Sequence, residues 1–142
     1  SHGDATCRNV IVDHDANVAT WIDFDTRHRV HLIAVYRQAD DLRTLVCSCV
    51  RWLDQAYYPV LIEAACVGYG DAEVITEMQR LFRDCRYPNV FQLAQAPLNV
   101  EEFLQLRELV SHRQATTPYP EAWESARLSI KPARESAPRW LR

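Results

Sequence analysis

The hydrophobic pattern of this chain changes its period near residue 37, and that change limits the folds it can adopt. Upstream, apolar residues gather in short runs or alternate with polar ones, which is typical of strands. This pattern predicts three strands joined by short polar turns, over residues 10–12, 18–25 and 30–36. Downstream, over residues 40–57, apolar positions fall three and four apart, which predicts an amphipathic helix.

The later segments alternate between the two patterns. The apolar run at residues 59–63 is of the buried-strand type, and residues 71–85 carry a second helical stripe. A fifth strand is predicted at residues 90–93, and Asn99 with Glu102 forms a capping box that opens a third helix. Strands that follow a helix are expected to pair in parallel. The predicted fold class is therefore α/β, a mixed five-stranded sheet of order βββαβαβα flanked by helices, as in the ribonuclease-H-like fold.

The length fits one domain. A chain of 142 residues is long enough for one core and short for two. We expect the domain over residues 1–115, with residues 116–142 as its less regular C-terminal helix or tail, because Pro and Ser become frequent there. No apolar run approaches the ~20 residues of a membrane span. The opening residues lack the apolar stretch of a secretory signal and are compatible with a cloning remnant.

The cysteines and glycines exclude several classes of site. Five cysteines without a CxxC pair argue against a disulfide framework and a zinc ribbon, so we expect reduced thiols and a cytoplasmic protein, in the host cell if it is viral. The three glycines form neither a GxxxxGK[ST] loop nor a GxGxxG turn. No membrane partner is expected.

The charge balance gives no basic field that would attract nucleic acid to the whole surface. The net charge is −3, yet of sixteen basic residues only Lys131 is a lysine. Arginine suits phosphate recognition through its planar fork, although genomic base composition explains the bias equally well. Arg80, Arg83 and Arg86 lie three apart and are candidates for contacts to a phosphate backbone, or form a solvated helix face.

Two acids are predicted to end neighbouring strands. Asp13 closes the first strand and Glu63 closes the fourth, so we expect their carboxylates at one edge of the sheet, with Asp15 nearby. Clustered carboxylates favour Mg²⁺ or Mn²⁺, and two such ions can drive phosphodiester hydrolysis. The alternatives remain open: Asp13 as a turn residue that accepts bonds from its own backbone, and Glu63 as the partner of an arginine.

A family resemblance begins at the second of these acids. Residues 56–68 (AYYPVLIEAACVG) resemble the second acidic motif of terminase large-subunit nuclease domains, and residues 86–91 (RYPNVF) are similar to a later segment of that family. Ile11-Val12-Asp13 resembles its first acidic strand, so the resemblance spans about residues 9–92. It implies a metal-dependent endonuclease of viral genome packaging that acts on double-stranded DNA beside other packaging subunits. Asp13, Asp15 and Glu63 would hold Mg²⁺ or Mn²⁺, with Asp13 and Glu63 catalytic.

The same resemblance leaves an alternative, because the third acid of the family has no counterpart after Asp84. A chain without that ligand would be a catalytically degenerate ribonuclease-H-like domain that binds protein or nucleic acid. Asp13-His14-Asp15 also invites comparison with the DxD motif of haloacid-dehalogenase phosphatases, but the lysine and acidic pair of that chemistry fit poorly. A nucleophilic pair of Cys66 and His14 lacks a third group to orient it.

Overall fold

The structure is a computed structural model that describes residues 1–25, 28, 31–84 and 98–113. Over these residues the chain is mostly helical, with four helices and one two-stranded antiparallel sheet. The elements are η1 (Cys7–Asn9), β1 (Val10–Asp13), β2 (Val18–Trp21), α1 (Ala34–Val50), η2 (Gln55–Tyr57), α2 (Tyr58–Tyr69), α3 (Ala72–Arg83) and α5 (Val100–His112).

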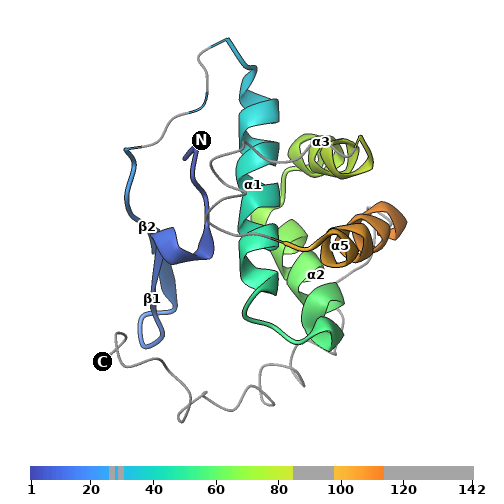
Figure 1. Ribbon diagram of the computed structural model, residues 1–142. Coiled ribbons are helices and arrows are strands. Elements are labelled where there is room, and N and C mark those ends of the chain that lie inside the picture. The colour runs from blue at the N-terminus through green and yellow to red at the C-terminus, as the bar shows by residue number, and fades with distance from the viewer. Residues whose placement is uncertain (26–27, 29–30, 85–97, 114–142) are drawn as a thin grey trace.

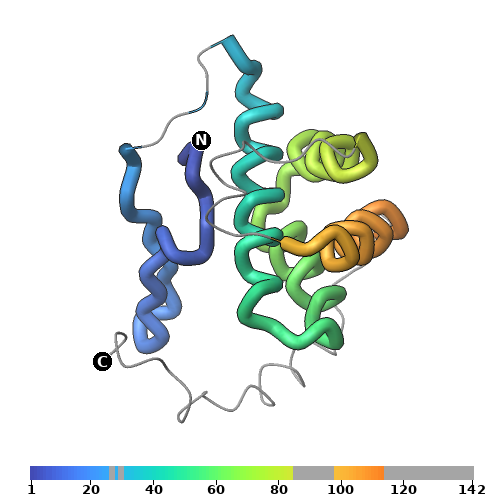
Figure 2. Tube along the Cα trace, viewed as in Figure 1, coloured from blue at the N-terminus to red at the C-terminus, as the bar shows by residue number. Residues whose placement is uncertain are grey.

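Helix α1 is the central element. In Figure 1 it stands between the N-terminal segment with its hairpin on one side and helices α2, α3 and α5 on the other. The tube in Figure 2 shows the same arrangement, with the first residues of the chain running alongside α1. A helix that is covered on two sides has to bury most of its circumference. Accordingly α1 buries polar residues such as Asp40, Arg43 and Thr44 as well as apolar ones.

The apolar core lies where α1, α2, α3 and α5 meet. Phe82 of α3 stacks on Phe103 of α5 with ring centroids 5.7 Å apart, which joins the last two helices. Apart from Cys47, which directly follows Val46, the other buried members are spaced by three or four along each helix, as an amphipathic stripe requires. They are Ala39, Leu42, Val46, Cys47 and Val50 of α1, Tyr58, Ile62 and Cys66 of α2, Val74, Met78 and Leu81 of α3, and Leu106 and Val110 of α5.

The hairpin packs little of its surface. Strand β1 pairs with β2 from Val10 opposite Trp21 to Asp13 opposite Val18, and Asn17 takes φ 54° in the turn between them. All its residues except Val10 are exposed, including the apolar side chains of Ile11 and Val12. A lone two-stranded hairpin is marginal in water, so its position depends on the segments at its two ends.

The predicted five-stranded mixed α/β sheet is wrong. The first two predicted strands are present as β1 and the shorter β2. The third, predicted over residues 30–36, is absent where the structure describes that range, because Ala34 already begins α1. Its alternating residues were too few to separate a strand from a helix start. The fifth, at residues 90–93, lies outside the described residues.

The fourth predicted strand is the larger error. Residues 59–63 belong to helix α2, which begins at Tyr58 with Pro59 in its first turn and ends at Gly70 with φ 74°. Pro is favoured at that position and Gly at the end of a helix. Tyr58, Ile62 and Cys66 are buried four apart, a helical stripe that extends past the short apolar run. A run of this length does not distinguish a buried strand from a buried helix.

The predicted helices are confirmed in outline. Helix α3 matches residues 71–85 closely, and α5 begins with the predicted capping box of Asn99 and Glu102. Helix α1 starts six residues earlier than the predicted 40–57 and ends earlier too. None of the helices in the described ranges combines the length and apolar character needed to cross a bilayer. The tail at residues 116–142 lies outside the described part.

Candidate active site

The N-terminal loop is polar and yet buried. His2, Asp4, Thr6 and Asn9 are each less than a tenth exposed. Burying polar groups costs free energy unless they find hydrogen-bond partners, so this segment has to be held by specific contacts. Gly3 between them has φ 87°, a left-handed conformation that glycine adopts without steric cost.

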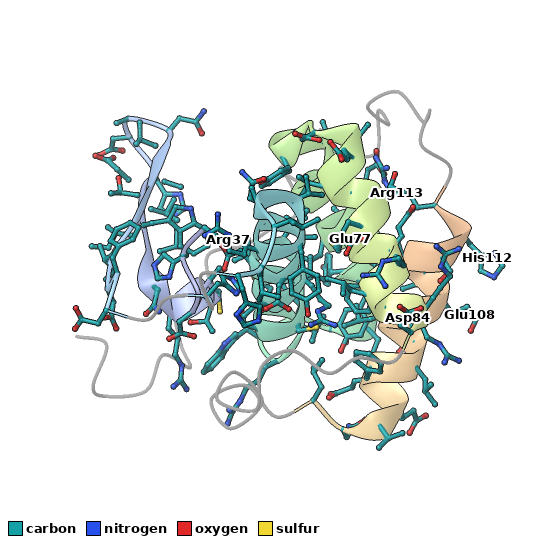
Figure 3. All side chains as sticks on the ribbon, turned by 90° about the horizontal axis from the view of Figure 1, so that it is seen from above. Arg37, Glu77, Asp84, Glu108, His112 and Arg113 are labelled. Carbon is teal, nitrogen blue, oxygen red and sulfur yellow. The ribbon has the colours of Figure 1, made fainter. Side chains whose placement is uncertain are left out.

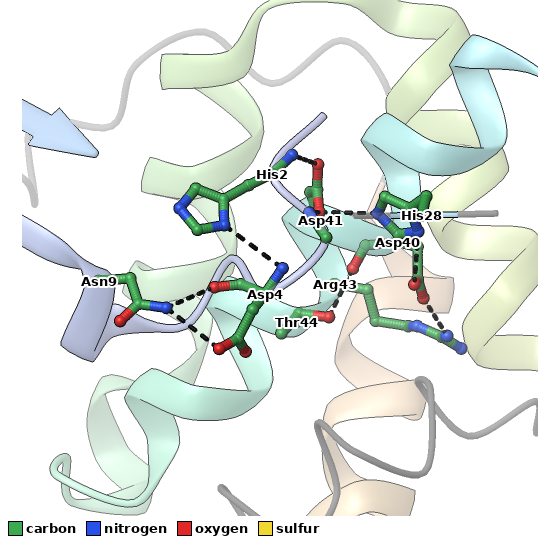
Figure 4. Close-up of polar contacts among 9 residues, drawn as sticks. His2, Asp4, Asn9, His28, Asp40, Asp41, Arg43 and Thr44 are labelled. Carbon is green, nitrogen blue, oxygen red and sulfur yellow. Dashed lines mark hydrogen bonds and ion pairs between the residues drawn. The ribbon is translucent and has the colours of Figure 1, made fainter. Parts of the chain in front are cut away.

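Asp41 of α1 holds the start of this loop. Its Oδ2 accepts a hydrogen bond from the His2 backbone N–H at 2.5 Å, and its Oδ1 accepts one from the Gly3 backbone N–H at 2.8 Å. The Nε2 atom of His28 lies 2.9 Å from the same Oδ1 (Figure 4). Bonds to an ionised carboxylate are stronger than neutral ones. One side chain of the central helix therefore fixes the backbone of His2 and Gly3.

Asp4 and Asn9 face one another across the loop. The Nδ2 of Asn9 donates to the Asp4 carbonyl oxygen at 2.9 Å and to Asp4 Oδ2 at 3.2 Å (Figure 4). Both bonds use the amide nitrogen, which leaves the amide oxygen of Asn9 for another group. The second carboxylate oxygen of Asp4, Oδ1, is buried without a hydrogen-bond partner among the described residues. A buried carboxylate oxygen in that state is a candidate for contact with a ligand.

His2 ties the loop to the segment that follows the hairpin. Its Nε2 lies 2.8 Å from the Ile22 carbonyl oxygen, and its ring lies against the rings of Trp21 and Phe24, at centroid distances of 5.1 and 4.7 Å. The Ile22 N–H donates to the Asn9 carbonyl oxygen at 2.9 Å. Asp23, the next residue, is thus held beside the loop.

Asp23 also has an unusual backbone conformation. Its φ is 61°, in the left-handed region that few non-glycine residues adopt. Such residues gather at functional sites, where the surrounding contacts compensate for the strain. The hydrogen bonds on both sides of Ile22 supply such contacts immediately before Asp23.

A second layer of polar groups lies behind Asp41 on α1. Asp40 pairs with the deeply buried Arg43 at 2.5 Å, and Arg43 Nη1 donates to the Leu81 carbonyl oxygen of α3 at 3.4 Å. His28 Nδ1 lies 3.8 Å from Asp40 Oδ2, so this histidine bridges the two acids of α1. The network extends from the loop through α1 to α3. The helix predicted over residues 40–57 would begin at Asp40 and Asp41, but these acids lie inside α1 because it begins at Ala34.

Cys7 lies between Asp4 and Asn9 and contacts the last turn of α1. Its N–H donates to Ser48 Oγ at 2.8 Å, and its thiol donates to the Ser48 carbonyl oxygen at 3.5 Å. A side-chain hydrogen bond with Cys49, with smaller contributions from Ser48 and Arg8, lowers the pKa of Cys7 to about 6 even though burial raises it. Full burial raises the pKa of Cys47, in contrast, to about 12.

Asp13 and Asp15 lie in the exposed turn of the hairpin. The Oδ1 of Asp13 accepts hydrogen bonds from the backbone N–H groups of Asp15, at 3.0 Å, and Ala16, at 2.9 Å. This is the turn-residue alternative that the sequence left open. The predicted role of both acids in metal binding stays a prediction.

Glu63 lies on helix α2 rather than at the end of a strand. Arg113 donates to it through Nε at 2.8 Å and through Nη2 at 3.3 Å, so the two side chains form a forked ion pair. The pair borders a hollow of about 530 Å³ between α2 and α5, lined also by Pro59, Leu109 and His112. Arg113 and His112 are labelled in Figure 3 at the end of α5. The sheet edge that was to bring Glu63 beside Asp13 is not present in the described structure.

The arginines predicted to bind a phosphate backbone lie on or beyond α3. Arg80 forms a two-pronged contact with Glu77, at 2.6 and 2.7 Å, and pairs with Asp84 at 2.6 Å; both acids are labelled in Figure 3. The hydrogen bond from Arg80 to Glu77 raises the pKa of the guanidinium above its usual range. Arg83 is exposed, and Arg86 lies outside the described residues. A phosphate would have to compete with two carboxylates for Arg80.

The described residues hold no group of three or more His, Cys, Asp or Glu side chains arranged as a metal site. Mg²⁺, however, is commonly held by one or two carboxylates together with water and substrate phosphates rather than by a complete protein cage. Beside the N-terminal loop a cavity of about 300 Å³ is lined by His2, Trp21, Phe24 and Asp41, among others. The loop therefore adjoins a space that can admit a small ligand.

Comparisons with protein-family models, with curated proteins and with solved structures found no match. The case for a function therefore depends on the geometry of this site.

Residues 1–9, whose polar sequence is compatible with a cloning remnant, supply most of the site. The signal was present as the spacing His2-x-Asp4-x₄-Asn9, followed by a hairpin and then Asp23-Phe24. A short polar stretch at the start of a chain resembles a cloning remnant, so this spacing alone does not indicate a site. Asp41, in contrast, carried no local signal, because its partners lie 38 and 39 residues away.

Proposed function

We propose that this chain carries the catalytic half of a kinase-like phosphotransferase, which moves the γ-phosphoryl group of a nucleotide to a hydroxyl group. The observation that supports it is the buried pair of Asp4 and Asn9, with His2 joined to the segment that leads into Asp23. Protein kinases use a catalytic loop of the pattern H-R-D-L-x-x-x-N and a later D-F-G. His2-Gly3-Asp4-Ala5 to Asn9 and Asp23-Phe24-Asp25 have the same spacing within each motif.

The residues present fit the roles that this chemistry requires. In kinases the Asp of the loop accepts the proton of the substrate hydroxyl. Asp4 keeps its Oδ1 buried and unpartnered within the described structure, as an acceptor for that proton. Mg²⁺ would be held by Asp23 and by the amide oxygen of Asn9, which takes no part in the contacts with Asp4. The metal ion neutralises charge on the phosphates. His2 orients this group through the Ile22 carbonyl, and Asp41 fixes the loop backbone.

Two departures from the kinase pattern define the scope of the proposal. Gly3 replaces the Arg of the loop and Asp25 replaces the Gly of D-F-G. Kinases also hold the nucleotide with a Gly-rich loop and a strand lysine. Neither pattern occurs in these 142 residues, so the proposal covers the catalytic half alone.

The endonuclease and the degenerate interaction module stay predictions. Their structural argument depended on a mixed sheet that delivers Asp13 and Glu63 to one edge, and that sheet is wrong. The acids now lie on an exposed turn and on helix α2, the latter paired with Arg113. The kinase-like assignment is favoured because Asn9 contacts Asp4 directly, while His2 and Asn9 both bond to the backbone of Ile22, next to Asp23.

The test separates the two enzymes by the acids that each requires. ADP formation from ATP with Mg²⁺ would be measured in the natural polypeptide that carries these residues, with water as acceptor when no substrate is known. We expect Asp4→Asn to lower the rate by about 10²–10⁴-fold, the range for loss of an acid–base group. Asp23→Asn should lower the rate as well, because it removes a charged ligand of Mg²⁺. Asp13→Asn is the matched control, because Asn forms the same turn.

Two results would overturn the proposal. One is ADP formation that is unchanged in Asp4→Asn and Asp23→Asn. The other is no ADP formation together with Mn²⁺-dependent plasmid cleavage that is lost in Asp13→Asn, which would support the endonuclease instead.

A further inference from the structure

Two thiols meet where the N-terminal loop crosses the last turn of α1. Cys7 of η1 is held there through its backbone and its sulfur, which contact Ser48 at 2.8 and 3.5 Å. Cys49 is the next residue of α1, and the interaction of its side chain with Cys7 lowers the pKa of Cys7. Ser48 is itself fixed, because its Oγ donates to the Leu45 carbonyl oxygen at 2.8 Å. The contacts with Ser48 therefore place the Cys7 thiol beside the turn of α1 that carries Cys49, 42 residues later in the chain.

The exposure of the cysteines singles out this pair. Cys7 and Cys49 are only partly buried, so a small solute can reach them. Cys47 lies on the same helix but is buried in the core, as is Cys66 of α2. Susceptibility of a thiol to oxidation follows its exposure, and a sensor cysteine commonly lies beside a second thiol that resolves the first product.

We propose that Cys7 and Cys49 form an oxidation site at which a hydroperoxide links the loop to α1. In the first step hydrogen peroxide transfers an oxygen to the Cys7 thiol, which becomes a sulfenic acid, and one water is released. In the second step the Cys49 sulfur displaces that hydroxyl group, an S–S bond forms, and its thiol proton leaves with the hydroxide as a second water. The two thiols are oxidised and the peroxide is reduced, so atoms and electrons balance. A dithiol reductant reverses the reaction.

The consequence for activity rests on the proposed function. Cys7 lies three residues after Asp4 and two before Asn9, so any shift of its backbone moves both. A disulfide brings two sulfurs to about 2.05 Å, well inside a hydrogen-bonded distance between thiols. Displacements of about 1 Å in a catalytic group can cost on the order of 10²-fold in rate. Oxidation is therefore expected to switch phosphoryl transfer off and reduction to restore it.

The chemical test needs no phosphoryl-transfer assay, so its failure is distinct from a failure of the proposed function. The intact chain would be treated with hydrogen peroxide, digested without reductant and mapped by mass spectrometry. We expect a linked pair of peptides that carry Cys7 and Cys49. In Cys49→Ser the link should be lost and Cys7 should be trapped as a sulfenic acid by dimedone. Cys47→Ser is the matched control on the same helix and should keep the link.

Absence of the linked peptides in the wild-type chain, or a link from Cys7 to another cysteine, would overturn the proposal. Circular dichroism of Cys49→Ser establishes that the variant is folded before its peptides are mapped. A disulfide that forms without any change in ADP formation would refute the switch.

Discussion

The carboxylate of Asp41 gives the sharpest test of how the site is built. It accepts bonds from the N–H groups of His2 and Gly3 and contacts His28, at 2.5 to 2.9 Å. In Asp41→Asn one oxygen becomes an NH₂ group, which cannot accept. If the remaining oxygen keeps its contacts with the Gly3 N–H and with His28, the new NH₂ group points at the His2 N–H. Two donors then face each other, and one charge-assisted hydrogen bond is lost. Such a bond contributes about 1.5–3 kcal/mol, so we expect a loss of about 2 kcal/mol of stability.

Urea unfolding measures this loss directly. With a slope of about 1–3 kcal/mol per molar urea, the midpoint should fall by about 1 M. Amide hydrogen exchange at His2 and Gly3 should become faster as well, because both lose their carboxylate acceptor. Asp54→Asn makes the same charge change in an exposed turn, where Asp54 accepts from the Ala56 N–H at 3.0 Å. Asn forms that turn equally well, so this control should stay within about 0.5 kcal/mol of the wild type.

Equal effects of Asp41→Asn and Asp54→Asn on the urea midpoint would refute the reasoning. So would unchanged exchange rates at His2 and Gly3 in Asp41→Asn. Either result would mean that the loop is held by something other than this carboxylate.

Three further predictions concern the core, a helix cap and the thiols. Phe82→Ala should lower the free energy of unfolding by about 3–5 kcal/mol in urea, whereas Leu104→Ala, on an exposed face, should change it by about 0.5 kcal/mol or less. Asn99→Ala should cost about 1 kcal/mol in the same assay through loss of the capping box, and Asn99→Asp should be nearly neutral. Alkylation of Cys7 by iodoacetamide should rise with pH around the lowered pKa of about 6, because the thiolate reacts, while buried Cys47, with a pKa raised to about 12, should stay unmodified. Equal labelling of the two cysteines at pH 7 would contradict the last prediction.

Local signals predicted the parts of this fold that local interactions determine. The capping box of Asn99 and Glu102 closes within four residues, and the stripe of α3 repeats within its own helix. Both were predicted correctly from the sequence. The run at residues 59–63 was misinterpreted because its helical stripe becomes visible only with Tyr58 and Cys66, outside the run.

The candidate site depends on long-range contacts, which explains why sequence reasoning missed it. The loop that carries Asp4 becomes buried only because Asp41 and Ser48 of α1 bind its backbone, 38 to 41 residues later in the chain. No period or propensity encodes such a pairing. Glu63 is a different case. The sequence alone indicated that an arginine could pair with it, but only the fold identifies that arginine as Arg113.

The way the loop is attached to α1 has a consequence for its response to temperature and salt. Apolar attachment weakens on cooling, because the hydrophobic effect loses strength in the cold. The His2 and Gly3 backbone is held instead by a carboxylate, which is 13% exposed and so is little screened by dissolved ions. Cooling should therefore loosen the apolar contacts of the helical core before it releases the loop, and added salt should weaken the Asp41 contacts of the loop only a little. The loop should therefore stay attached to α1 during storage in the cold and during purification in high salt.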